Sequence, residues 1–140
     1  MNHYTITELS LGQSEQFTVT VTAEMLDRFR DYSGDVNPLH NDENYAAERG
    51  YPGRVVFGML VAGFYSTLAG VYLPGELCLL HEVTTKFKKP VFIGDVLTIT
   101  GRISEIQEAF GRIEIDAKIT NQNGITVNRG CIKAGILQKK

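Results

Sequence analysis

The sequence predicts an α+β fold in which an antiparallel sheet curls around one buried helix. Apolar residues recur at helical spacing in the first half of the chain, and from Leu77 onward they alternate with polar residues. Helices followed by a run of strands are typical of α+β layers. The stretch between the two halves, about residues 58–73, is apolar on most sides, and such a helix must be surrounded by protein.

The first elements are a strand and a short helix. Residues Gln16–Val21 alternate between apolar and polar side chains, which predicts a half-buried strand. Thr22 is a typical helix N-cap and Gly34 a typical helix stop. With Met25, Leu26, Phe29 and Tyr32 at helical spacing, these signals predict an amphipathic helix from Ala23 to Tyr32.

Two shorter segments precede the central helix. Asp35–His40 is predicted to be free of helix, because Pro38 pushes the residue before it into extended geometry. A second short helix is predicted to begin near residue 41 or 42 and to end at Gly50. The central helix of about residues 58–73 then ends at Pro74-Gly75.

The last part of the chain is predicted to form four antiparallel strands. Asn123-Gly124 is a strong signal for a tight hairpin turn. Apolar positions before and after Asn128–Gly130 are out of phase, so a bulge is expected there. The predicted strands are Leu77–Val91, Val96–Ile106, Gly111–Asn121 and Ile125–Leu137.

Composition limits the function. With 140 residues and neither repeat nor linker, the chain is predicted to be one domain, residues 1–140. A net charge of -2 argues against nucleic acid and against electrostatic binding to membranes. The N-terminus does not resemble a signal peptide, so a cytoplasmic protein is expected. Cys78 and Cys131 are expected to be free thiols, with no metal and no redox cofactor.

The segment Asp35-Val36-Asn37-Pro38-Leu39-His40 carries the groups suited to catalysis. An imidazole can give or take a proton near neutral pH, and a carboxylate beside it can accept one. Asn37 can orient a neighbour or a water molecule. From these residues alone, a second interpretation is equally good: Asp35 and Asn37 form an Asx turn, and His40 caps the following helix.

Three segments resemble the MaoC-like dehydratases, which include the (R)-specific enoyl-CoA hydratases. The first is YSGDVNPLHNDENYA at Tyr32–Ala46, the second is GMLVA at Gly58–Ala62, and the third is KKPVFIGD at Lys88–Asp95. They occur in the family's order and spacing and cover most of the chain. The first motif is highly specific, whereas the other two are shared more loosely among hot-dog proteins.

The resemblance implies a hot-dog fold, with the sheet around the central helix, and a homodimer or a higher oligomer of dimers. It also implies addition of water to trans-2-enoyl-CoA to give (R)-3-hydroxyacyl-CoA, and the reverse dehydration, without a cofactor. Carried over by position, Asp35 and His40 are the catalytic pair and Asn37 supports them. Asp35 is favoured as the base and His40 as the acid in hydration.

Around this pair, the start of the central helix is expected to bind the thioester. Backbone N–H groups at a helix N-terminus are unpaired, so the N–H of Gly58 is assigned to the developing enolate oxygen. Phe57, Met59 and Gly63 are expected to line the acyl pocket. Two of them depart from the family pattern, which often has His at position 57 and in several members has Ser at position 63.

Basic residues offer contacts for the phosphates of coenzyme A. Lys86, Lys88 and Arg54 are the candidates. The alternative is that the lysines, with Lys89, blunt a solvated edge strand and that Arg54 is an ordinary surface charge.

Three other functions remain open. The same chemistry on an acyl carrier protein would make this a 3-hydroxyacyl-ACP dehydratase of fatty-acid or polyketide synthesis. A non-catalytic hot-dog partner subunit would be expected to lose Asp35 or His40, and this chain keeps both. A hot-dog thioesterase usually places an acidic residue on the central helix, and residues 58–73 contain none.

Overall fold

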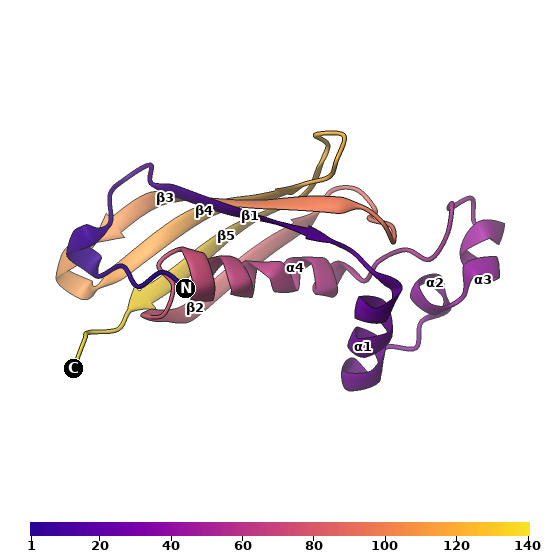
Figure 1. Ribbon diagram of the computed structural model, residues 1–140, viewed down its shortest axis with the longest axis horizontal. Coiled ribbons are helices and arrows are strands. Elements are labelled where there is room, and N and C mark those ends of the chain that lie inside the picture. The colour runs from indigo at the N-terminus through magenta and orange to yellow at the C-terminus, as the bar shows by residue number, and fades with distance from the viewer.

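The five strands form one antiparallel sheet in the order β1-β3-β4-β5-β2, and helix α4 lies against one face of it (Figure 1). The computed structural model describes residues 1–140. This arrangement confirms the predicted fold class, a hot-dog domain with a central helix. The elements are η1 (Ile6–Glu8), β1 (Ser14–Thr20), α1 (Ala23–Ser33), α2 (Pro38–Asn41), α3 (Glu43–Glu48), α4 (Gly58–Thr67), η2 (Leu68–Tyr72), β2 (Cys78–Phe87), β3 (Val96–Gln107), η3 (Glu108–Phe110), β4 (Arg112–Thr120) and β5 (Thr126–Ile136).

Helix α1 has the ends that its sequence predicts. The hydroxyl of Thr22 accepts the backbone N–H of Met25 at 3.3 Å and caps the helix. Gly34 ends it in the left-handed conformation, with φ of 75°, and its N–H donates to the carbonyl of Arg30. Together, α1, α2 and α3 lie beyond the end of the sheet, next to the N-terminal end of α4 (Figure 1).

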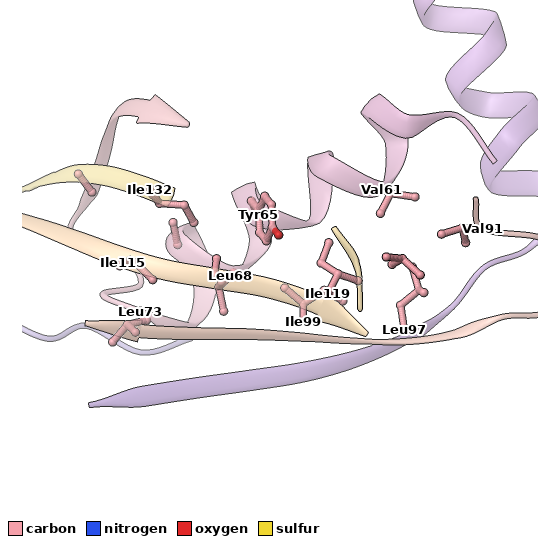
Figure 2. Packing of buried hydrophobic residues seen from close by; sticks show 14 of the residues in the cluster. Val61, Tyr65, Leu68, Leu73, Val91, Leu97, Ile99, Ile115, Ile119 and Ile132 are labelled. Carbon is pink, nitrogen blue, oxygen red and sulfur yellow. The ribbon is translucent and has the colours of Figure 1, made fainter. Parts of the chain in front are cut away.

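The buried helix is divided into two parts. It is α-helical over Gly58–Thr67, and the next five residues, Leu68–Tyr72, widen into a π-helical turn, η2. Figure 2 shows Val61, Tyr65 and Leu68 pointing at the inner face of the sheet. There they meet Ile99, Ile115, Ile119 and Ile132, which are all fully buried. Each such side chain contributes about 1.5–3 kcal/mol through burial.

The β4–β5 hairpin turns at Asn123-Gly124, as predicted. The side-chain oxygen of Asn121 accepts the backbone N–H groups of Asn123 and Ile125, and Gly124 has φ of 72°. The bulge expected at 128–130 lies one residue earlier. Ile119 pairs with Asn128 and Thr120 with Thr126, so Val127 is the extra residue. As a result, Val127 and Asn128 are both buried, although they are neighbours in a strand.

Strand β2 is shorter than predicted, and the reason bears on the site. The expected strand Leu77–Val91 leaves the sheet after Phe87. The following loop turns back at Asp95, whose carboxylate accepts the N–H of Phe92 at 3.0 Å. Within this loop, the carbonyl of Val91 accepts the N–H of Val56 at 2.8 Å, so the loop is tied to the residues that precede α4. No helix in the structure is long and apolar enough to cross a bilayer.

Candidate active site

The loop between α1 and α2 is held by its own side chains. Asp35 Oδ1 accepts the N–H of Asn37 at 3.1 Å, which makes an Asx turn. Asn37 Oδ1 accepts the N–H of Leu39 at 3.0 Å and caps α2. Both residues therefore fix the backbone that leads to His40, while Asp35 Oδ2 makes no hydrogen bond within the chain.

One prediction for this segment is wrong. Residues 35–40 were expected to be free of helix, but Pro38 begins the single turn α2. Proline is tolerated at the first helical position, because the N–H that it lacks has no partner there in any helix. His40 consequently lies in a helical turn. It does not cap the next helix, since Asp42 accepts the N–H groups of Asn44 and Tyr45 and caps α3.

His40 is held in one orientation from two sides. Its Nδ1 lies 2.7 Å from the carbonyl oxygen of Val55. A carbonyl only accepts hydrogen bonds, so Nδ1 carries a hydrogen, and Nε2 is the ring nitrogen left to bind or release a proton. The ring also packs against Phe57, with 4.4 Å between ring centroids. The imidazole therefore presents one defined nitrogen for proton transfer.

A cleft of about 270 Å³ opens beside His40. It lies between the first turns of α4 and the loop that follows β2. Five of its twelve lining residues are valines, and the others include the polar side chains of His40 and Asn128. The lining residues are His40, Val55, Val56, Gly58, Val61, Phe87, Lys88, Lys89, Pro90, Val91, Val127 and Asn128.

Gly58 stands at the first position of α4, on the wall of this cleft. Its backbone N–H has no acceptor in the chain, as expected at a helix N-terminus. A Cβ atom here would lie 2.8 Å from Cε1 of Phe87, which is closer than side chains approach one another. The absence of a side chain at Gly58 thus admits the ring of Phe87 in this structure.

The three residues predicted to line the acyl pocket do not line the cleft. Phe57 is buried behind His40 and also packs on Phe29, with 4.6 Å between ring centroids. Met59 is 63% exposed. Gly63 is exposed one turn later, and a Cβ atom there would meet nothing within 4 Å. In the single chain, Met59 and Gly63 therefore face solvent, because they lie on the side of α4 that the sheet leaves uncovered.

Of the three predicted phosphate contacts, only Lys88 lines the cleft. Lys86 lies near the end of β2, next to Phe87, whose ring points toward α4. Successive side chains in a strand point to opposite faces, so Lys86 lies on the outer face of the sheet. Arg54 is already engaged. It forms a 2.9 Å salt bridge with Asp27 and donates to the carbonyl of His40 at 2.7 Å, and its side chain is only 12% exposed. Lys86 therefore lies outside the cleft, and the phosphate contacts of Lys86 and Arg54 stay predictions. An ordinary surface charge does not describe Arg54, because its side chain is largely buried.

Asn128 is the residue that the sequence did not single out. It is 1% exposed, lies in β5 on the cleft wall, and is the one polar side chain in the buried set. Its Oδ1 accepts hydrogen bonds from the hydroxyls of Tyr65 and Thr85, each at 2.9 Å. Burial raises the pKa of Tyr65, so this hydroxyl keeps its proton and donates it to the bond. The signal in the sequence was its position at the expected bulge, Asn128–Gly130, where strand alternation does not determine which side chain turns inward.

The cysteines and the other side chains that commonly bind metal ions do not cluster in the structure. Cys78 and Cys131 are free and half-buried, as expected. No three or more His, Cys, Asp or Glu side chains come close enough together to hold a metal ion. Asp35 and His40 are not joined by a hydrogen bond or an ion pair, so a group between them would have to connect the two.

Comparisons with known proteins agree with one another. The family described as "MaoC like domain" matches residues 8–124. The chain is 38% identical to the (R)-specific enoyl-CoA hydratase of Rhodospirillum rubrum over 70% of its own length and 67% of that protein. It is 32% identical to the enzyme of the same name from Aeromonas caviae, over 83% of this chain and 87% of that one. The unliganded R-hydratase PhaJ1 of Pseudomonas aeruginosa superimposes with a TM-score of 0.91 at 29% identity, covering 96% of this chain and 86% of that one.

Proposed function

This chain belongs to the MaoC-like domain family, and from that membership we propose that it hydrates trans-2-enoyl-CoA to (R)-3-hydroxyacyl-CoA and catalyses the reverse dehydration. It is a hydro-lyase. The observation that carries the proposal within this chain is the position of His40. Its ring nitrogen Nδ1 is fixed by Val55, and the residue lines a cleft that also contains the N-terminus of α4.

The thioester carbonyl would bind at the front of α4. The Gly58 N–H is unpaired and stands at the positive end of the helix dipole. Addition of an oxygen nucleophile at C3 moves negative charge onto the thioester oxygen, so a donor placed there stabilises the transition state more than the ground state. One such donor is worth about 10²- to 10³-fold in rate.

Asp35 and His40 would share one water molecule. As the water oxygen bonds to C3, one of the two groups removes its proton, and the electron pair of the C2–C3 double bond moves toward the thioester. The other group then delivers a proton to C2. We assign the free Oδ2 of Asp35 as the base and His40 as the acid in hydration. To act as the acid, the ring enters the step with a hydrogen on Nε2 as well as on Nδ1, and it gives the Nε2 hydrogen to C2. Each positioned proton transfer is typically worth about 10²–10⁴-fold. Asn37 supports the pair by fixing the loop.

The coenzyme A part of the substrate would leave the cleft past Lys88 and Lys89, which are exposed on its wall. Two ammonium groups at this mouth suit a phosphate-bearing carrier. An acyl carrier protein presents the same phosphopantetheine arm, so 3-hydroxyacyl-ACP dehydration is the alternative substrate form. Metabolism of acyl thioesters in the cytoplasm is the setting that we propose.

We also propose that the protein is a homodimer, built through the edge of β2. This edge strand carries Leu79, Leu80, Val83 and Phe87, which are 40–56% exposed in the single chain. An exposed apolar edge strand is a site for pairing with another chain. The uncovered side of α4, with Met59 at 63% exposure, supports the same conclusion. A partner on this side would give Met59 and Gly63 a protein neighbour.

A direct assay tests the function. Purified protein is incubated with short and medium trans-2-enoyl-CoAs, the loss of enoyl absorbance is followed, and the product's configuration is resolved by chiral chromatography. We expect turnover to the (R)-3-hydroxyacyl product. Parallel assays with enoyl-ACP show which carrier has the higher kcat/KM. Absence of turnover with both carriers, in a folded protein, would leave a non-catalytic partner subunit, and release of free thiol from a saturated acyl-CoA would indicate a thioesterase instead.

A further inference from the structure

The side-chain amide of Asn128 has a defined orientation, and only its oxygen has hydrogen-bond partners. Its Oδ1 accepts from Tyr65 and from Thr85, whereas its Nδ2 is buried and donates to no atom of the chain. The reverse orientation would direct the amide N–H₂ at the two hydroxyls and leave the hydrogen of each hydroxyl without an acceptor. The hydroxyls thus hold the amide with its donor directed elsewhere.

A buried donor without a partner is costly. The folded state loses about 1–3 kcal/mol of stability when such a group loses its hydrogen bonds to water and forms none within the protein. The residue lies 1% exposed among apolar neighbours, and isosteric apolar side chains would avoid this loss. A polar group that joins Asn128 Nδ2 in the working enzyme would remove it.

The position of Asn128 indicates what that group touches. Asn128 pairs with Phe87 across the β2–β5 ladder, and the ring of Phe87 packs on Gly58. Val61 and Val127 complete this inner part of the cleft. An acyl group whose carbonyl is held at Gly58 would therefore extend along valine side chains toward the amide donor of Asn128, and a longer group would reach further along this wall.

We propose that Asn128 is a specificity-determining residue that makes this enzyme selective for short enoyl groups. The inference rests on the proposed hydratase function. With a short acyl group, a water molecule remains bound to Asn128 Nδ2. A long saturated tail has to displace that water and offers no hydrogen-bond acceptor, and such a displacement loses affinity. Tyr65 and Thr85 are positioning residues, because they act through the amide.

The test compares trans-2-butenoyl-CoA with trans-2-decenoyl-CoA in wild type and in Asn128→Leu, which has nearly the same shape and no donor. We expect wild type to favour the short substrate and Asn128→Leu to raise the ratio of kcat/KM for decenoyl over butenoyl by about tenfold. The dissociation constants of butyryl-CoA and decanoyl-CoA, which do not react, should shift in the same direction when measured by calorimetry. Asn123→Ala, at the exposed hairpin tip, is the control and should leave both ratios unchanged.

The outcomes separate the two claims. If wild type hydrates neither substrate, the proposed function fails, and the inference fails with it. If wild type is active but a folded Asn128→Leu keeps the wild-type ratios within a factor of about two, only the inference is overturned. Should Asn128→Leu not fold, as judged by circular dichroism, the Tyr65→Phe, Thr85→Val double variant decides. It keeps Asn128 and frees its amide to turn, so an intermediate rise of the ratio supports the proposal and an unchanged ratio overturns it.

Discussion

The Nδ1 atom of His40 lies 2.7 Å from the carbonyl oxygen of Val55, 15 residues further along the chain. This contact joins α2 to the strand-like segment that leads into α4. It also determines the tautomer, since the carbonyl needs a hydrogen on Nδ1. Nε2 is thereby left for the proton transfer that hydration of an enoyl thioester requires.

The first prediction separates the two nitrogens of His40. In His40→Asn, the side-chain amide can still donate to Val55, but it offers nothing in place of Nε2. We expect a folded protein whose kcat falls by about 10²- to 10⁴-fold. Asp35→Asn should lose activity in the same range. The measurement is enoyl-CoA hydration together with circular dichroism, and His3→Gln, at an exposed position, is the control. Undiminished turnover in either folded variant would refute the assignment of the catalytic pair.

A second prediction concerns the first residue of α4. In Gly58→Ala, the new methyl group would lie 2.8 Å from the ring of Phe87, so the ring has to move into the cleft or the helix has to shift. We expect kcat/KM to fall by up to about 100-fold, because small misplacements at a reacting centre have effects of that size. The double variant Gly58→Ala, Phe87→Leu gives the ring's place to a smaller side chain and should recover part of the loss. If the two changes are simply additive, Phe87 is not the cause.

Arg54 provides a third prediction, with a stability readout. Its guanidinium joins Asp27 of α1 to the carbonyl of His40. Arg54→Met should lower the free energy of unfolding by roughly 1.5–3 kcal/mol, which is typical for hydrogen bonds to charged groups. The matched control is Arg28→Met, whose salt bridge with Glu24 is exposed on both sides and should contribute at most about 0.5 kcal/mol. Urea denaturation measures both values. A raised KM for acyl-CoA with unchanged stability would instead support Arg54 as a phosphate contact.

Local signals in the sequence predicted the local structure well. The cap at Thr22, the stop at Gly34 and the turn at Asn123-Gly124 each depend on residues within a few positions, and all three are confirmed. Pro38 misled because the same residue either ends a helix or begins one, depending on its position in the turn.

Long-range contacts account for the features that sequence reasoning missed. The partners of Arg54 are 27 and 14 residues away, and Asn128 meets Tyr65 at a separation of 63 residues. The periodicity of apolar residues in the sequence does not indicate which distant residues come into contact. The motif around His40 indicated the chemistry, but only the fold shows that Val55 fixes its tautomer and that Asn128 stands on the same cleft.

The fourth prediction is a pH dependence of thiol reactivity. Burial raises the pKa of Cys78 to about 11. The reactive form is the thiolate, so Cys78 should react slowly with thiol reagents at pH 8 and progressively faster toward pH 11. In the unfolded chain the thiol has its ordinary pKa of about 8.5 and reacts at once. The folded protein keeps the Cys78 thiol protonated up to a higher pH than the unfolded chain does. The contribution of this thiol to the free energy of unfolding is therefore fully present below about pH 8.5 and is lost as the pH rises toward about 11. Cys78→Ala, with Cys131 retained, should remove this component of the pH dependence, and an equal dependence in that variant would contradict the assignment.

The last prediction concerns assembly through β2. Val83 lies in the middle of this edge strand, on the side of the sheet that faces α4, and is 40% exposed although it is apolar. In a dimer formed along β2 it would be buried, so Val83→Lys would place an unpaired ammonium group in an apolar interface. We expect wild type to sediment as a dimer and Val83→Lys as a monomer. The matched control is Thr18→Lys in β1, the opposite edge of the same sheet, which should remain dimeric. The β2 edge would be ruled out as the contact if wild type is a monomer. It would also be ruled out if Val83→Lys stays dimeric while Thr18→Lys dissociates. Met59 and Gly63 are exposed on the neighbouring side of α4, and we propose that the partner covers them to complete the acyl pocket. On that proposal, the monomeric variant should also show a higher KM for enoyl-CoA.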